Sequence, residues 1–108
     1  MNHAQRTASI EYHFGEIMKL SNTKGKEYAN SETDANSNFK KIGVELNIDP
    51  KQILWVYKQK HNHAIAHFLK TGKIESTEPI KGRIYDEILY DFLLLTLLDE
   101  EENEAMPF

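Results

Sequence analysis

The chain has 108 residues, of which 40% are hydrophobic and 28% charged, with no cysteine and a net charge of −4. This length suits one domain over residues 1–108. The lack of cysteine excludes disulfides, thiolate metal sites and cysteine nucleophiles. Residues 1–9 are polar, and the longest apolar run, 92–98, is far shorter than the roughly 20 residues of a membrane span. We therefore expect a soluble, cytoplasmic protein with no membrane contact.

The charge is distributed unevenly along the chain. Residues 40–74 hold seven lysines and two acids, whereas residues 75–108 hold ten acids and two basic residues. Two solvated faces of opposite sign are the simplest interpretation. The two segments can also attract each other, within one fold or between copies, and the basic segment can face an anion such as a nucleotide phosphate.

Apolar residues at helical spacing predict a first helix over 8–24. Its stripe consists of Ile10, Phe14, Ile17 and Met18, and Gly25 is a plausible stop, although the helix can continue toward Tyr28. The polar segment 30–38 predicts a loop that ends in a helix cap near Asp34 or Asn36.

The second helix is predicted over 36–46 and the third over 50–70. Asp49 is expected to cap the third helix, with Pro50 at its first position. The residues expected to face inward are Phe39, Ile42 and Leu46 on the second helix, and Ile53, Tyr57, Ala64, Ile65 and Phe68 on the third.

The fourth helix is predicted over 78–100, capped by Ser76 or Thr77, with Pro79 in its first turn. After Ile88 it is apolar nearly all round, which predicts the centre of a bundle and part of a homodimer face. Residues 99–108 are expected to form a solvated acidic tail, because the helix dipole disfavours carboxylates at a C-terminus. Four helices with short connections predict an all-α, antiparallel four-helix bundle.

Three acids of the fourth helix, Asp86, Glu87 and Asp91, lie within two turns. Carboxylate oxygens are the ligands that Mg²⁺ prefers, so these residues are a candidate metal site. The simpler interpretation is that Glu87 and Asp91 are solvated or pair with lysine or arginine.

The predicted third helix contains three histidines, His61, His63 and His67. His63 and His67 have the spacing of two metal ligands, but Ala64 stands where a metalloprotease helix has its glutamate, so surface histidines are the favoured interpretation. His61 shares a stripe with Tyr57 and is expected to be at least half buried, with a partner. Asp86, paired with Lys60 or His61, is the candidate buried acid.

Residues 39–54 also match the apolar and turn spacing of a helix-turn-helix motif, with Gly43 as the small residue and a turn at Asn47. Lys51 and Gln52 would face the groove. The acidic total charge and the lack of arginine in this segment make DNA an unfavoured partner.

Several segments in order carry a family resemblance. They are 24–29 (KGKEYA), Asp34 with Asn38-Phe39, Lys60-His61 with Ile65, Glu78-Pro79-Ile80, and Arg83-Ile84 with 86–90. This order resembles small phage and prophage proteins of the nucleotide modification associated domain 1 family, over about 24–98. The chain departs from the pattern at Leu89 and Asp91, where the family favours an asparagine and an apolar residue.

The resemblance implies a role in phage nucleotide or DNA-modification metabolism inside a bacterial host cell, without specifying a reaction. The polar positions that match, and that we expect to bind a nucleotide or another phosphorylated ligand, are Lys24, Glu27, Tyr28, Asn38, Lys60, His61, Arg83 and Asp86. Two other functions stay open: a non-enzymatic protein that binds a host or defence protein through the last helix, and a DNA binder.

Overall fold

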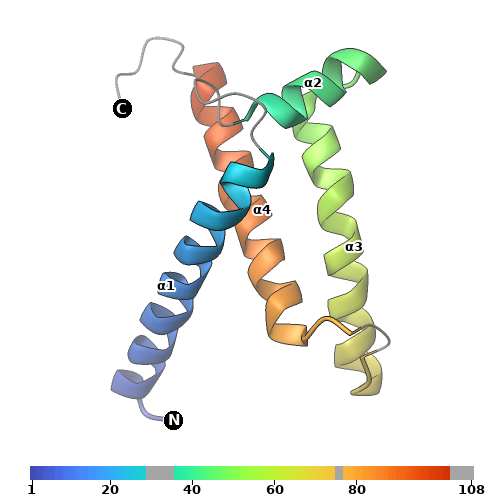
Figure 1. Ribbon diagram of the computed structural model, residues 1–108. Coiled ribbons are helices and arrows are strands. Elements are labelled where there is room, and N and C mark those ends of the chain that lie inside the picture. The colour runs from blue at the N-terminus through green and yellow to red at the C-terminus, as the bar shows by residue number, and fades with distance from the viewer. Residues whose placement is uncertain (29–35, 75–76, 103–108) are drawn as a thin grey trace.

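The computed structural model describes residues 1–28, 36–74 and 77–102, with the backbone alone in 24–28. These residues form four helices and no strand: α1 (His3–Tyr28), α2 (Ser37–Leu46), α3 (Pro50–Thr71) and α4 (Ile80–Glu102) (Figure 1). The predicted all-α class is therefore confirmed. No helix in the described part of the chain is both long enough and apolar enough to cross a membrane.

Helix α1 begins five residues earlier than predicted because of a reciprocal cap at its start. The Asn2 backbone N–H donates to Gln5 Oε1 and the Gln5 backbone N–H donates to Asn2 Oδ1, each at 2.8 Å. This exchange satisfies two donors at the helix start, as in a capping box. The helix also continues past Gly25 to Tyr28.

The connection between α2 and α3 follows the predicted turn. Asn47 adopts the left-handed conformation (φ 54°), and Asp49 caps α3 by accepting from the Lys51 N–H at 2.9 Å. Gly43 lies directly under this turn: a Cβ there would meet the Ile48 carbonyl oxygen at 2.6 Å. A side chain at this position would therefore push α2 away from the start of α3.

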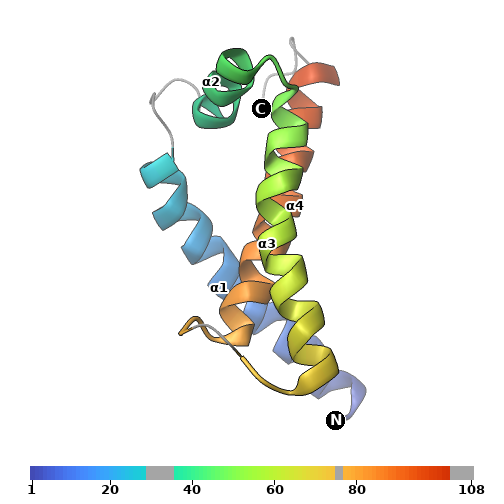
Figure 2. The same cartoon turned by 90° about the vertical axis from the view of Figure 1, so that its right-hand side faces the viewer.

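The main packing is between α3 and α4, which run in opposite directions (Figures 1 and 2). Helix α2 lies across the beginning of α3, and α1 packs against α4 (Figure 2). In Figure 1, α1 and α4 run in the same general sense and α1 diverges from α3. The radius of gyration is 16.0 Å, whereas a compact domain of this length has about 13 Å.

The core lies where α2, α3 and the second half of α4 meet, so the predicted central role of this part of α4 is confirmed. Its buried members are Phe39, Ile53, Leu54 and Leu97, with Ile42, Tyr90, Leu93 and Leu94 packed around them. Two expected inward positions are wrong, because Leu46 is 60% and Tyr57 41% exposed. On α1 only Ile17 of the predicted stripe is buried.

The fourth helix was predicted to end at residue 100, but α4 continues to Glu102, so the predicted acidic tail is wrong for 101–102. Lys40 pairs with Glu100 at 2.5 Å and Lys51 pairs with Glu101. Asn36 Nδ2 also donates to Glu100 at 2.6 Å. These partners offset the unfavourable dipole at the helix end. The basic middle and the acidic end of the chain thus attract each other within one fold; the rest of the predicted tail, 103–108, lies outside the described residues.

Candidate functional site

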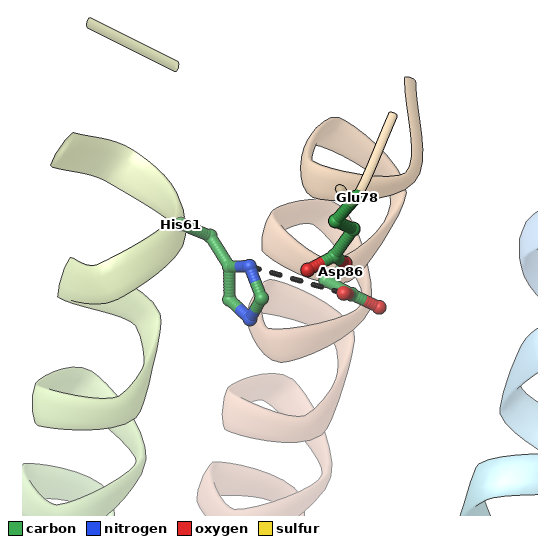
Figure 3. A group of neighbouring side chains, drawn as sticks. All are labelled: His61, Glu78 and Asp86. Carbon is green, nitrogen blue, oxygen red and sulfur yellow. Dashed lines mark ion pairs between the residues drawn. The ribbon is translucent and has the colours of Figure 1, made fainter. Parts of the chain in front are cut away.

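A buried polar cluster lies between α3 and the first half of α4 (Figure 3). His61 and Asp86 are each 5% exposed, and His61 Nδ1 is 3.8 Å from Asp86 Oδ2. Arg83 joins them: its Nη1 donates to His61 Nδ1 at 3.3 Å, and its Nε lies 3.2 Å from Glu78 Oε2. The expected burial of His61 is therefore confirmed, and of the two expected partners of Asp86, Lys60 and His61, it is His61 that lies beside the acid.

These contacts set the protonation state and the tautomer of His61. Burial lowers the pKa of His61 below its ordinary value of 6.5, and Lys60 and Arg83 lower it further, while Asp86 and Glu78 oppose the shift. Arginine has no acceptor, so Nδ1 must accept in its contact with Arg83 and the neutral ring carries its proton on Nε2. At neutral pH the cation of the cluster is thus Arg83, and His61 is a neutral acceptor.

The same cluster contains a group of potential metal ligands. One ligand atom each from His61, Glu78 and Asp86 lies within 4.8 Å of the others. However, the guanidinium of Arg83 contacts both His61 and Glu78, so a metal ion would have to share this space with a fixed positive charge. A histidine in the set also departs from the oxygen shell that Mg²⁺ prefers. The cluster fits a structural ion-pair network better than a metal centre.

The other two acids of the predicted metal site lie apart from this group. Among the described residues, neither Glu87 nor Asp91 belongs to a group of three or more potential ligands. Asp91 instead pairs with Lys58 on α3 at 2.6 Å. Lys58 also lies over the Trp55 ring, 5.1 Å from its centroid, which holds the lysine in place.

A cavity of about 350 Å³ opens beside the cluster, where α2, α3 and α4 meet. The described residues that line it are Asn38, Phe39, Val56, Tyr57, Lys60 and Tyr90. The rings of Phe39 and Tyr57 lie 6.1 Å apart between centroids. Tyr90 connects the cavity to the buried cluster, since its ring also lies 5.6 Å from that of His61.

The predicted ligand residues thus divide into two neighbouring groups. Asn38 and Lys60 line the cavity, whereas His61, Arg83 and Asp86 form the buried cluster behind Tyr90. The side chains of Lys24, Glu27 and Tyr28, and Asp34, lie outside the described residues.

The sequence did not indicate that aromatic side chains line this cavity. Phe39 was expected only in the core and Tyr57 only facing inward. Helical spacing places such residues on a face, but it cannot show that two of those faces leave a gap between them.

The candidate helix-turn-helix is present as a pair of helices joined by a tight turn, α2 and α3. Its expected DNA-facing lysine, Lys51, is engaged by Asp49 at 2.9 Å and by Glu101 of α4. The acidic end of α4 therefore lies beside the start of α3, where it would repel a phosphate backbone.

The cavity and the buried cluster together contain five of the predicted ligand residues: Asn38, Lys60, His61, Arg83 and Asp86. The chain matches no family model, no characterised protein and no solved structure.

Proposed function

We propose that the cavity between α2, α3 and α4 binds a mononucleotide or a similar planar, phosphorylated small molecule. The observation that carries this proposal is the combination of aromatic rings with one lysine and one amide in a single cavity. Its volume of about 350 Å³ lies at the small end of the roughly 300–1,000 Å³ range of ligand sites. A single ring system with a short substituent therefore suits it better than a dinucleotide.

Five of the six described lining side chains have a role in this proposal. Tyr57 and Tyr90 offer aromatic surface, on which nucleobases stack, and the buried ring of Phe39 supports them from the core. Lys60 offers a mobile ammonium group for a phosphate. The side-chain amide of Asn38 both donates and accepts, so it can pair with a base edge. The buried cluster behind Tyr90 supports the wall of the cavity rather than contacting the ligand.

The resemblance to the nucleotide modification associated domain 1 family supports the same ligand class. Of the cavity residues, Asn38, Phe39, Lys60 and Tyr90 lie in the segments that carry this resemblance. We therefore place the proposed activity in phage nucleotide metabolism, with binding of the nucleotide as its first step.

A thermal-shift and calorimetric panel of nucleoside mono-, di- and triphosphates, with and without Mg²⁺, tests this proposal. We expect at least one nucleotide to stabilise the protein, and Lys60→Met to weaken its binding by about tenfold or more, because a charge-assisted hydrogen bond is lost. Lys70→Met is the matched control: this lysine also lies exposed on α3 but does not line the cavity. No stabilisation by any nucleotide, or equal losses in both variants, would contradict the proposal.

A second candidate function is protein interaction, favoured by the exposed apolar surface on α1 and α4. Sixteen large hydrophobic residues of the described chain are exposed, against six that are buried. Ile10, Phe14 and Met18 lie one turn apart on α1 and are 62%, 51% and 44% exposed. Phe14 packs edge-to-face on Phe92 of α4, with 6.2 Å between ring centroids.

This contact joins the stripe on α1 to apolar surface on α4. Ile88 and Leu95, one turn on either side of Phe92, are 37% and 55% exposed. We propose that a second copy of the chain covers this surface. A two-fold dimer pairs the same patch on both copies, so one apolar face is sufficient.

Light scattering during size exclusion tests the self-association. We expect a dimer, which Phe14→Ser dissociates by removing an aromatic contact at the centre of the face, with binding weakened by about tenfold. Val44→Ser is the control, because Val44 is 83% exposed on α2, away from the proposed face. A monomeric wild-type protein would exclude the second copy and leave the face for a different protein, such as a host factor.

A further inference from the structure

A second cavity lies at the opposite end of α3 from the α2 contact, where the chain turns back into α4. Its volume is about 410 Å³. Four side chains with basic nitrogens line it: His63 and His67 of α3, Lys73 of the turn and Arg83 of α4. No carboxylate is among the described residues that line it. The two cavities have no described lining residue in common.

Local structure accounts for this concentration of nitrogen donors. His63 and His67 are four residues apart and so lie one above the other on one face of α3. Gly72 ends α3 in the left-handed conformation (φ 70°), and the Lys73 N–H then donates to Thr71 Oγ1 at 3.1 Å. This reversal returns the chain toward the histidines, so that Lys73 shares their cavity.

Arg83 reaches the same cavity from the facing helix. Its position is fixed by two partners, because Nε lies 3.2 Å from Glu78 Oε2 and Nη1 donates to His61 Nδ1. Glu78 offsets part of the charge of Arg83, so Lys73 and His63 are the principal donors. A donor that is already held in place loses little conformational entropy when a ligand binds.

Electrostatics decides between the two ligand classes that such a cavity can take. The spacing of His63 and His67 is that of a metal-binding pair. A divalent cation between them would also face the ammonium of Lys73 and the guanidinium of Arg83, without a carboxylate from the described lining to balance the charge. An anion meets N–H donors from every polar side chain that lines the cavity.

We propose that this cavity is a binding site for a phosphate group, either free inorganic phosphate or the phosphate of a small ester. A tetrahedral oxyanion with up to two negative charges can accept from the imidazoles, the ammonium and the guanidinium at once. The apolar wall formed by Ile74 and Ile80 leaves room for the organic part of an ester. This proposal stands apart from the mononucleotide site, because it uses a different cavity and different donors.

Titration of the full chain with inorganic phosphate, followed by NMR of the imidazole resonances, tests the proposal. We expect saturable shifts of the His63 and His67 signals with phosphate, and none with chloride at equal ionic strength. Lys73→Ala should weaken the binding by about fivefold to tenfold. The double variant His63→Gln/His67→Gln should weaken phosphate binding at least as much, as measured by calorimetry. These side chains are exposed or half buried, so the variants should remain folded.

The control for general charge effects is Lys70→Ala, which removes the same charge three residues earlier from a side chain that does not line the cavity. An equal loss in Lys70→Ala and Lys73→Ala would overturn the proposal, as would the absence of saturable shifts. Shifts of the two histidine signals with Zn²⁺ but not with phosphate would overturn the proposal and indicate a metal site instead. Titration with a phosphate monoester in parallel distinguishes the free anion from an ester, since the better ligand binds more tightly.

Discussion

At the residue scale, the most informative group is His61. It is 5% exposed and lies among a guanidinium and two carboxylates from α4 and the segment that precedes it. Burial is the largest cause of its lowered pKa, which means that the folded protein disfavours the charged imidazole. A buried neutral histidine that accepts from an arginine holds that arginine in place.

The lowered pKa of His61 predicts that the stability of the protein depends on pH. Because the pKa of His61 is lower in the folded chain than its ordinary value of 6.5, the unfolded chain binds the proton more readily. The contribution of His61 to stability is fully present above pH 6.5 and is lost progressively as the pH falls from there toward the folded pKa. Melting temperatures should therefore decrease on acidification through this window.

His61→Asn isolates this contribution, because its Oδ1 can accept from Arg83 as Nδ1 does but cannot titrate. The variant should melt at a lower temperature at neutral pH and show a weaker dependence on pH than the wild type. His3→Asn is the control, because its side chain is exposed at the start of α1. An identical pH profile for the wild type and His61→Asn would contradict the assigned charge state.

Arg83 is expected to contribute strongly to the free energy of unfolding, because it contacts both His61 and Glu78. Removing one partner from a buried charged network leaves the others without compensation, and such losses cost about 3–5 kcal/mol for fully buried pairs. Glu78 is partly exposed, so we expect about 2–3 kcal/mol for Arg83→Met, by urea denaturation. Lys81→Met, an exposed position on the same helix, should change the stability by less than about 0.5 kcal/mol.

At the element scale, the close approach of α2 to the start of α3 depends on Gly43. A Cβ there would meet the Ile48 carbonyl oxygen at 2.6 Å and the Pro50 ring at 3.3 Å. These neighbours belong to a turn and to a proline ring, neither of which can rotate away. The prediction of a small residue under a tight turn is thus explained by contact with the backbone, independently of any DNA-binding role.

Gly43→Ala should therefore destabilise the protein by about 1–3 kcal/mol, as measured by urea denaturation, because the added methyl group forces the two helices apart. Gly15→Ala is the matched control, since a Cβ at this position in α1 meets nothing within 4 Å. That change should stabilise the protein by about 0.5–1 kcal/mol through helix propensity. A neutral Gly43→Ala would show that the turn can relax without cost.

At the scale of the whole molecule, the open arrangement of α1 matters most. This helix packs on α4 but diverges from α3 (Figure 1). Its apolar side chains Ile10, Phe14 and Met18 are exposed. If a second copy covers this surface, folding and association are coupled. The melting temperature should then rise with protein concentration, because dimer formation stabilises the folded state by mass action.

Differential scanning fluorimetry over a wide range of protein concentrations measures this effect. The Phe14→Ser variant should lose the concentration dependence, whereas Val44→Ser should keep it. A melting temperature that is independent of concentration in the wild type would count against the dimer.

Local sequence patterns predict the helical class, most helix boundaries and the burial of His61, but they leave Lys60 and His61 both open as partners of Asp86. These follow from local rules: helical spacing, the Asp49-Pro50 start and the Gly72 end are encoded within a few residues. The reciprocal cap of Asn2 and Gln5 was not predicted, although both residues lie close together at the start of α1.

Which charges meet, and where a cavity remains, depends on how the helices pack against one another. Glu100 and Glu101 extend α4 because Lys40 and Lys51 lie beside them, although sixty and fifty residues away in sequence. The predicted ligand residues separate into a cavity and a buried cluster because they lie on different helices, whose packing sets their distances. Spacing along one helix fixes the face on which a side chain lies, but the angle between two helices fixes what that face meets.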